Sequence, residues 1–258
     1  MPAEPVAAAA ARRVVPPLVL VAVLAAAWQL VAASNPYLLP RPSATLAQLA
    51  DHPGTYLDTA RATVVEAALG LLVGGAVAVA LAVATVQSRL VEGAVMPLAV
   101  ALNVTPVVAV GPALVVALGF GIGPKVILTG LIVFFTVFAT TRAGLRSVDP
   151  ELLDVLRVLH ATRTDLLVRV QLPAAVPAML TGLRVALPLS VVGAVVAEFV
   201  APGSSGGLGT LITTARAYSN LSVVYAAIVC LAVLGIAVTA AVSAVERTVR
   251  RRRGVADR

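Results

Sequence analysis

"RVLHATRTDLLVRVQLP", the stretch at residues 157–173, brings charged side chains at helical spacing and a closing proline into an otherwise apolar chain. The chain has 258 residues, of which 60% are hydrophobic and 12% are charged. A soluble domain carries about twice that charged fraction, so these proportions indicate a protein whose main solvent is the lipid bilayer. The charged stretch must then lie in water.

This stretch belongs to a longer polar segment, residues 142–173, which contains five arginines and four acidic residues. Each charge costs about 2.5–3.5 kcal/mol at the centre of a spanning helix, so burying nine would cost on the order of 20 kcal/mol. We therefore expect the whole segment to lie outside the bilayer.

Local signals predict a short amphipathic helix early in the segment. Asp149 can cap a helix that has Pro150 at its first position. Its apolar residues recur at i, i+3, i+4 and i+7 and form one stripe, made of Leu152, Val155, Leu156 and Leu159.

A second short helix is expected after a turn at His160 and Ala161. Thr162, with Asp165 three residues later, is a variant of the capping box. This helix is expected to run through Leu166 and to end near Leu172 and Pro173. Because so small a helix pair cannot build its own core, its apolar stripe rests on the membrane, on the rest of the chain or in a groove of another protein.

Six windows of about 20 mostly apolar residues meet the requirement for spanning helices: 14–33, 62–86, 94–118, 125–141, 174–199 and 223–245. The third contains Pro97, Pro106 and Pro112, each of which removes a backbone donor. We expect this window to be bent, or to be a short surface helix followed by a bent span.

The arginines predict the orientation, because cytoplasmic loops carry the excess of Lys and Arg. With both termini inside, fourteen basic residues lie in the cytoplasm, including five in residues 142–173. The outer loops then hold four, Arg41, Arg61, Lys125 and Arg216. This asymmetry accounts for the net charge of +7 without a nucleic-acid partner. An alternative for the first window is a signal peptide cleaved after "VAAS" at residues 31–34.

The polar segment resembles the EAA loop of bacterial ABC importer permeases, whose consensus is E-A-A, three residues, G, nine residues, I, one residue, L-P. Here Asp154-Val155-Leu156, His160, Val170 and Leu172-Pro173 stand at the same spacing. The flanking "VVAEFVAPGSSGGLGTLI" and "GFGIGP" resemble the subgroup that serves sulfonates, taurine, nitrate and thiamine precursors. Asp154 replaces the first glutamate, Val155 and Leu156 replace the alanines, and His160 replaces the glycine.

The resemblance implies an all-α membrane protein with about six transmembrane helices and the type I importer permease fold. The expected divisions are an N-terminal tail with the first span and outer loop at 1–61, the permease core at 62–246 with its coupling loop at 142–173, and a basic tail at 247–258. It also implies two permease copies, two cytoplasmic ABC ATPases, an extracytoplasmic solute-binding protein and a bacterial inner membrane location. The ATPase would use ATP and Mg, and no cofactor, metal or catalytic residue is expected in this chain.

The resemblance also implies an ATPase-coupling site, made of Leu152, Asp154, Val155, Leu156, Leu159, His160, Ala161, Leu166, Leu172 and Pro173. Charged side chains inside spanning helices are costly and usually functional, so Arg184 and Glu198 are candidates for the translocation pathway. For both, structural hydrogen bonding is the competing interpretation. Gly70 and Gly74 form a GxxxG pattern that favours close helix packing within one subunit.

Two other classes of protein remain as alternatives. An ion-coupled secondary transporter would need coupling charges inside the membrane and often two similar halves, whereas here such charges are sparse and no repeat is evident. A membrane enzyme would need a convergent catalytic cluster, whereas the acids and His160 in residues 149–165 read as caps and polar faces. The identity of the solute is not encoded in any motif that we find.

Overall fold

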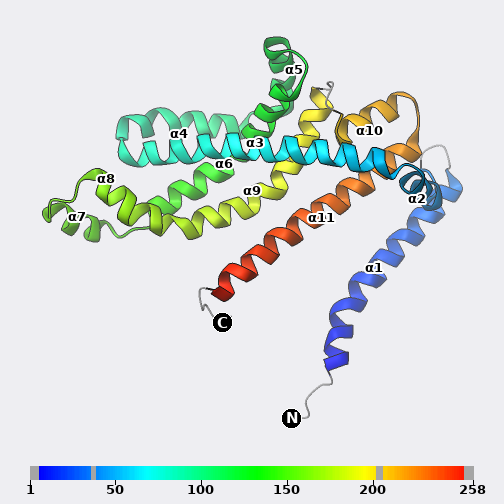
Figure 1. Ribbon diagram of the computed structural model, residues 1–258, viewed down its shortest axis with the longest axis horizontal. Helices are drawn as coiled ribbons and strands as arrows, with labels where there is room; N and C mark the ends of the chain where they lie inside the picture. The colour runs from blue at the N-terminus through cyan, green and yellow to red at the C-terminus, as the bar shows by residue number, and fades with distance from the viewer. Residues whose placement is uncertain (1–5, 36–38, 202–205, 253–258) are drawn as a thin grey trace.

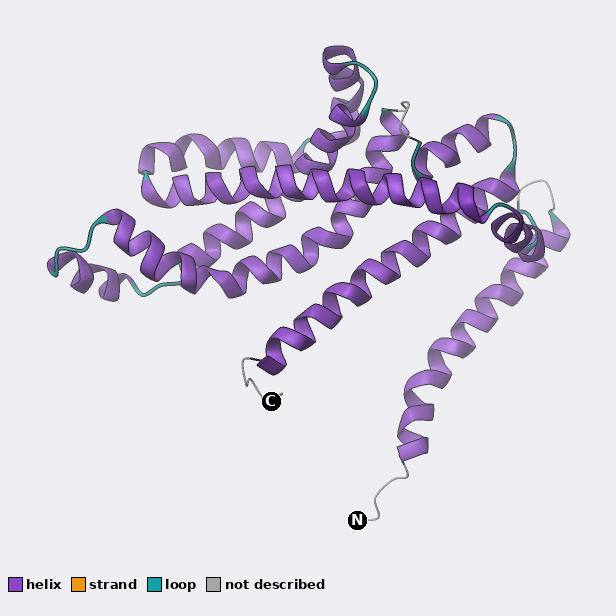
Figure 2. Cartoon of the chain, viewed as in Figure 1, coloured by secondary structure: helices purple, strands orange, loops and turns teal. Residues whose placement is uncertain are grey.

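Long helices joined by short loops form the framework of the chain. The computed structural model describes residues 6–35, 39–201 and 206–252, and none of these lies in a β-strand (Figure 2). In chain order the helices are α1 (Val6–Ser34), α2 (Pro42–Asp51), α3 (Pro53–Gln87), α4 (Arg89–Val104), α5 (Val107–Leu118), α6 (Ile122–Leu145), α7 (Pro150–Val158), α8 (Arg163–Leu166), α9 (Leu172–Val200), α10 (Leu208–Ala217) and α11 (Leu221–Arg252). The expected all-α class is confirmed.

Four helical stretches in the described residues are long and apolar enough to cross a bilayer. They are α3, α6, the stretch Arg163–Val200 and the segment Leu221–Ala244 of α11. The bent pair α4 and α5 is a fifth candidate. The apolar segment Val19–Ser34 of α1 is shorter, but α1 as a whole has 29 residues. The set agrees with about six membrane helices.

The irregular third window is broken where a proline permits it. α4 and α5 meet at an angle of 102°. Thr105 and Pro106 between them have extended backbones, as expected for a proline and for the residue before it. Pro97 and Pro112 lie inside α4 and α5, so the sharp break occurs at only one of the three prolines.

The centre of the bundle is the packing of α6 between α3 and α9, the most extensive helix contacts in the chain (Figure 1). Small residues allow the close approach. A Cβ added to Gly70 would lie 2.4 Å from Thr129 Cβ, and one added to Gly74 would lie 2.5 Å from Gly130 Cα. The two glycines therefore serve α3–α6 packing within one subunit, which confirms the prediction. Phe134 and Phe138 stack beside them in the core, with ring centroids 5.6 Å apart.

The helix α1 diverges from this bundle, so most of α1 lies apart from the other helices (Figure 1). Trp28 provides its connection. The indole Nε1 donates to the Pro40 carbonyl at 3.0 Å, and the ring lies 5.9 Å from that of Tyr225 on α11. The expected domain boundary at 61–62 falls inside a helix, because α3 begins at Pro53.

Candidate functional site: the coupling helices and a buried polar cluster

The first helix of the polar segment, α7, starts as its sequence dictates. Asp149 accepts a hydrogen bond from the Glu151 backbone N–H at 2.9 Å, and Pro150 takes the first helical position. The helix has nine residues. Its capped start confirms the predicted helix.

That stripe is uncovered. Leu152, Val155 and Leu159 are 48%, 58% and 69% exposed, and Leu156 is half-buried. Burying a leucine or valine fully would contribute roughly 1.5–3 kcal/mol each, and about half or more of the surface of Leu152, Val155 and Leu159 remains to be buried. Of the three surfaces open to the stripe, the rest of the described chain is therefore not the one that covers it.

The end of α7 is a Schellman motif, the commonest helix stop that requires a left-handed residue. The Ala161 N–H donates to the Leu156 carbonyl and the His160 N–H to the Arg157 carbonyl, both at 3.0 Å. His160 occupies the left-handed position with φ 63°. A glycine at the same place in the EAA consensus meets this requirement without a Cβ penalty.

The second helix begins as predicted but does not end where predicted. Thr162 and Asp165 form a reciprocal capping box, in which the Asp165 N–H donates to Thr162 Oγ1 at 3.1 Å and the Thr162 N–H to Asp165 Oδ2 at 3.2 Å. The expectation that the helix stops near Leu172 and Pro173 is wrong, because the chain continues through a π-helical turn into α9. In that turn the Leu172 N–H donates to Leu167 O, five residues back. The wider turn accommodates a proline where an α-helix would be strained.

The ten predicted coupling residues therefore occupy one continuous corner of the molecule. Asp154 is exposed and its Oδ1 accepts from Arg157 at 2.6 Å. Leu166 is buried, Ala161 and Leu172 are half-buried, and Pro173 is exposed. Just before this corner, two ion pairs that the sequence did not reveal join α4 to the end of α6. Glu92, in the first turn of α4, accepts from Arg142 at 2.5 Å and from Arg146 at 2.6 Å, at the end of α6.

A second polar group lies inside the bundle. Lys125 on α6 is 0% exposed, Glu66 on α3 is 1% exposed, and Nζ lies 2.8 Å from Oε1. The expectation that Lys125 belongs to an outer loop is therefore wrong. A buried ammonium is tolerated because it has a carboxylate partner, and that partner stands 59 positions earlier in the sequence.

Glu198, on α9, closes the same region of the bundle. It is fully buried, and its Oε1 accepts from the Thr63 hydroxyl at 2.7 Å. Its Oε2 accepts from the backbone N–H groups of Gly209 and Thr210 in the first turn of α10, the latter at 3.1 Å. The Leu208 N–H donates to Thr63 Oγ1 at 2.9 Å. Glu198 thus acts as a cap from another helix, and its charge complements the positive end of α10.

The second predicted pathway residue is not brought to this cluster. Arg184 lies on α9, 14 positions before Glu198, and its side chain is exposed. At 1.5 Å per residue the two lie about 21 Å apart along the helix. Of the "PGSSGGLG" loop, residues 202–205 lie outside the described residues, and Gly207 is the N-cap of α10, a helix that was not expected.

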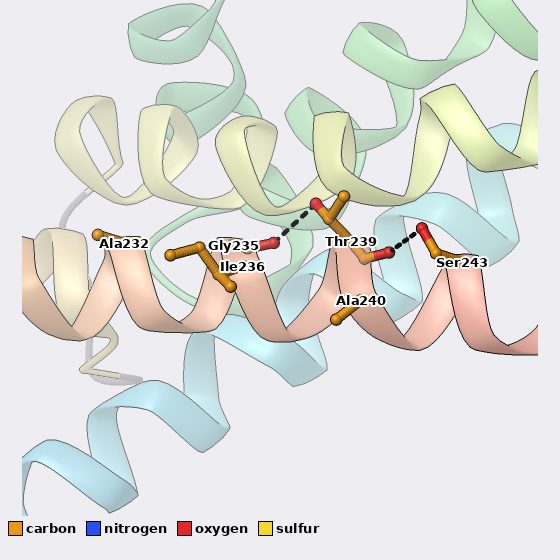
Figure 3. A pocket seen from close by; sticks show the side chains of 6 residues that line it. All are labelled: Ala232, Gly235, Ile236, Thr239, Ala240 and Ser243. Carbon is orange, nitrogen blue, oxygen red and sulfur yellow. Dashed lines mark hydrogen bonds between the residues drawn. The ribbon is translucent and has the colours of Figure 1, made fainter. Parts of the chain in front are cut away.

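One hollow in the described part of the chain is apolar. A shallow groove of about 520 Å³ follows α11 (Figure 3) and is lined by Ala232, Gly235, Ile236, Thr239, Ala240 and Ser243. Its hydroxyls are used within the helix, since Thr239 donates to Gly235 O at 2.8 Å and Ser243 to Thr239 O at 2.9 Å. No group of three potential metal ligands occurs in the described residues.

Apolar spans that carry a capped helix pair beyond their ends are the architecture of a multi-pass membrane protein. Residues 62–251 match the family described as binding-protein-dependent transport system inner membrane component, and the chain belongs to that family. This membership confirms the resemblance to ABC importer permeases.

Three relatives illustrate the breadth of the family. A probable ABC transporter permease protein of Haemophilus influenzae is 36% identical, over 83% of this chain and 88% of the relative. The formylaminopyrimidine transport permease protein ThiX of Halalkalibacterium halodurans is 33% identical, over 82% and 84%. The putative aliphatic sulfonates transport permease protein SsuC of Bacillus subtilis is also 33% identical, over 84% and 80%. The chain is an ABC importer permease of the sulfonate and thiamine-precursor subgroup.

Proposed function

We propose that this chain moves a small polar solute across the bacterial inner membrane when a separate ATPase pulls on its coupling loop, residues 142–173. The solute is an organic anion or similar nutrient, such as a sulfonate, taurine, nitrate or a vitamin precursor, delivered by an external binding protein. Two copies of the permease form the pathway, and two cytoplasmic ATPases bind and hydrolyse ATP with Mg. Both termini of the chain lie in the cytoplasm.

The exposed apolar stripe of α7 is the observation that carries this proposal. A stripe of three exposed aliphatic side chains on a helix capped at both ends is preformed for docking into a groove. Glu92 pairs with Arg142 and Arg146 and so joins the start of α4 to the end of α6, the helix that leads directly into α7. The sequence has no phosphate-binding GxxxxGK[ST] motif, so the ATP-hydrolysing site is assigned to the partner.

The docking role is tested by placing a charge on the stripe. In the permease reconstituted with its ATPase, Leu159→Asp and Val155→Asp should abolish assembly and solute-stimulated ATP hydrolysis, because an aspartate cannot be buried unpaired in an apolar groove. Both side chains are exposed, so the variants should still fold. Val158→Asp is the matched control, since Val158 is 79% exposed on the same helix but lies off the stripe. Normal hydrolysis by Leu159→Asp, or equal loss in Val158→Asp, would contradict the docking role.

The choice of an anionic solute rests on Arg184 and on the subgroup. The guanidinium fork matches sulfonate and carboxylate oxygens, and Arg184 is exposed on a spanning helix. We expect Arg184→Leu to leave assembly with the ATPase intact but to lower uptake of labelled solute, whereas Arg184→Lys should retain part of the uptake. Unchanged uptake in Arg184→Leu would remove this residue from the pathway.

One observation favours a second candidate, an ion-coupled secondary transporter. Glu66, Lys125 and Glu198 place three ionisable groups inside the bundle, as ion-coupled carriers do. We prefer the ATP-driven permease, because the contacts of Lys125 with Glu66 and of Glu198 with α10 are those of structural partners. Proteoliposomes that contain the permease without its ATPase distinguish the two, because only a secondary transporter would accumulate solute in response to a proton or sodium gradient.

A further inference from the structure

A polar pocket of about 650 Å³ lies between the coupling helices and the corner where α3 meets α4. Its walls come from the last turn of α3, the first turn of α4, the end of α6, and α7 and α8. Unlike the groove on α11, it is rich in charge. Four arginines line it, with one glutamate: Arg89, Arg146, Arg157, Arg163 and Glu92.

Two of these arginines already have a carboxylate partner. Arg146 lies 2.6 Å from Glu92, and Arg157 lies 2.6 Å from Asp154. Arg89 and Arg163 have no carboxylate partner among the described residues. Arg163 makes one long hydrogen bond, 3.4 Å, to the Gln87 carbonyl, and the Arg89 side chain is exposed. The pocket therefore holds two unneutralised guanidinium groups on facing elements, α4 and α8.

Such a pocket is built for an anion with several oxygens. A concave site lined by one sign of charge focuses its field, and guanidinium groups bind phosphate oxygens in pairs. The start of α4, a helix of 16 residues, adds its positive end at Ser88 and Arg89. A phosphoryl group bridging Arg89 and Arg163 would satisfy both cations.

The position of the pocket indicates where that phosphoryl group comes from. α3 ends at Gln87, α4 begins at Arg89 and α6 ends at Leu145, so the pocket lies at the level where the spans leave the hydrocarbon. Phosphates of lipid headgroups are concentrated at that level. In the orientation proposed above, on which this step rests, the pocket faces the cytoplasmic leaflet, whose anionic lipids attract arginines there.

We propose that this pocket binds the phosphate of an anionic membrane lipid, with Arg89 and Arg163 as its ligands. The bound phosphate joins α8 to the α3–α4 corner and holds the coupling helices in position relative to the spans. Anionic lipid thereby becomes a requirement for efficient coupling, separate from the contact between α7 and the ATPase.

Binding is tested on the purified, delipidated permease, with no ATPase present. Phosphatidylglycerol should be retained in native mass spectrometry and should raise Tm, and phosphatidylcholine should do neither. The double variant Arg89→Gln/Arg163→Gln should weaken phosphatidylglycerol retention roughly thirtyfold, from the loss of two charges near an anionic surface. Arg61→Gln/Arg216→Gln, two exposed arginines outside the pocket, should leave retention unchanged. Equal retention in both double variants would overturn the proposal.

Two further measurements test whether the pocket binds another anion in place of the lipid phosphate. If millimolar inorganic phosphate raises Tm as much as phosphatidylglycerol does, the pocket is a site for free phosphate and the lipid assignment fails. If Arg89→Gln/Arg163→Gln loses ATPase assembly in a neutral detergent without anionic lipid, the ligand is an acidic side chain of the ATPase, and the proposal is again overturned. Loss of ATP hydrolysis only in vesicles that contain phosphatidylglycerol, with assembly intact, supports it. The lipid-binding test uses the permease alone, so its result holds even if α7 proves to have no coupling role.

Discussion

Single residues account for the polar contacts that hold α3, α6 and α9 in register. Lys125 and Glu66 are almost fully buried, and the ammonium and carboxylate lie 2.8 Å apart. Removing both charges from water is costly, so the pair is stabilising only while it is intact. Glu66 also interacts electrostatically with Glu198, so the pair is coupled to the contact between α9 and α10.

We predict that Lys125→Met lowers the free energy of unfolding by about 3–5 kcal/mol, because it leaves the Glu66 carboxylate buried without its cation. The double variant Lys125→Met/Glu66→Leu should recover most of that loss, since an apolar pair replaces the ion pair. Unfolding of the purified protein in detergent measures both. Arg61→Met, an exposed change on α3, is the control and should have little effect. Strictly additive losses would show that the two residues are not coupled.

His160 determines how α7 stops. Its φ of 63° lies in the left-handed region, where a residue with a Cβ costs about 1–2 kcal/mol, and a β-branched residue fits worst. His160→Gly should therefore preserve solute-stimulated ATP hydrolysis in the reconstituted complex, and His160→Val should reduce it severalfold by displacing α7. His52→Val is the control, because His52 has φ −129° and is exposed. Equal rates of ATP hydrolysis in His160→Val and the parent protein would mean that coupling does not depend on the left-handed turn between α7 and α8.

Elements pack here through small residues, and the pair Gly74 and Gly75 shows how sharply position matters. A Cβ on Gly74 would meet the Gly130 backbone at 2.5 Å, whereas one on Gly75 would meet nothing within 4 Å. We predict that Gly74→Ala forces α3 and α6 apart and destabilises the protein by roughly 1–3 kcal/mol. Gly75→Ala should be neutral or slightly stabilising, because alanine is the better helix former. Thermal unfolding of the two variants provides the comparison, and equal Tm values would exclude close α3–α6 packing.

Which elements can be predicted from sequence depends on the range of the contacts that define them. The starts of α7 and α8 depend on caps within three residues, so Asp149 and Thr162 identify them directly. The break at Pro106 is also local. The continuation of α8 through Pro173 depends on a π-turn, for which "LVRVQLP" contains no distinctive signal.

The features that sequence did not predict depend on distant partners. α10 has ten residues and follows glycines, and its start is fixed by Glu198 and Thr63 from two other helices. Lys125 near a predicted span end looks like a loop cation until Glu66 is placed beside it. For the candidate site, the local geometry of α7 was therefore predictable, whereas the Glu92 ion pairs between α4 and α6 and the buried cluster were not.

In the predicted topology of the whole molecule, basic residues are distributed very unequally along the membrane normal. Because Lys125 is buried in α6, the outer side of the predicted topology keeps only Arg41, Arg61 and Arg216. The opposite side keeps fourteen. The correction therefore strengthens the prediction that the coupling helices and both termini face the cytoplasm.

This orientation can be measured with two exposed threonines, Thr164 on α8 and Thr214 on α10. In a Cys230→Ala background, which removes the single cysteine, Thr214→Cys should react with a membrane-impermeant maleimide on intact cells. Thr164→Cys should react only after permeabilisation, because the positive-inside rule places residues 142–173 in the cytoplasm. Thr164→Cys in permeabilised cells controls for side-chain accessibility. Labelling of Thr164→Cys on intact cells would place the coupling helices outside, beyond the reach of any cytoplasmic ATPase, and would remove the physical basis of ATP-driven transport through α7.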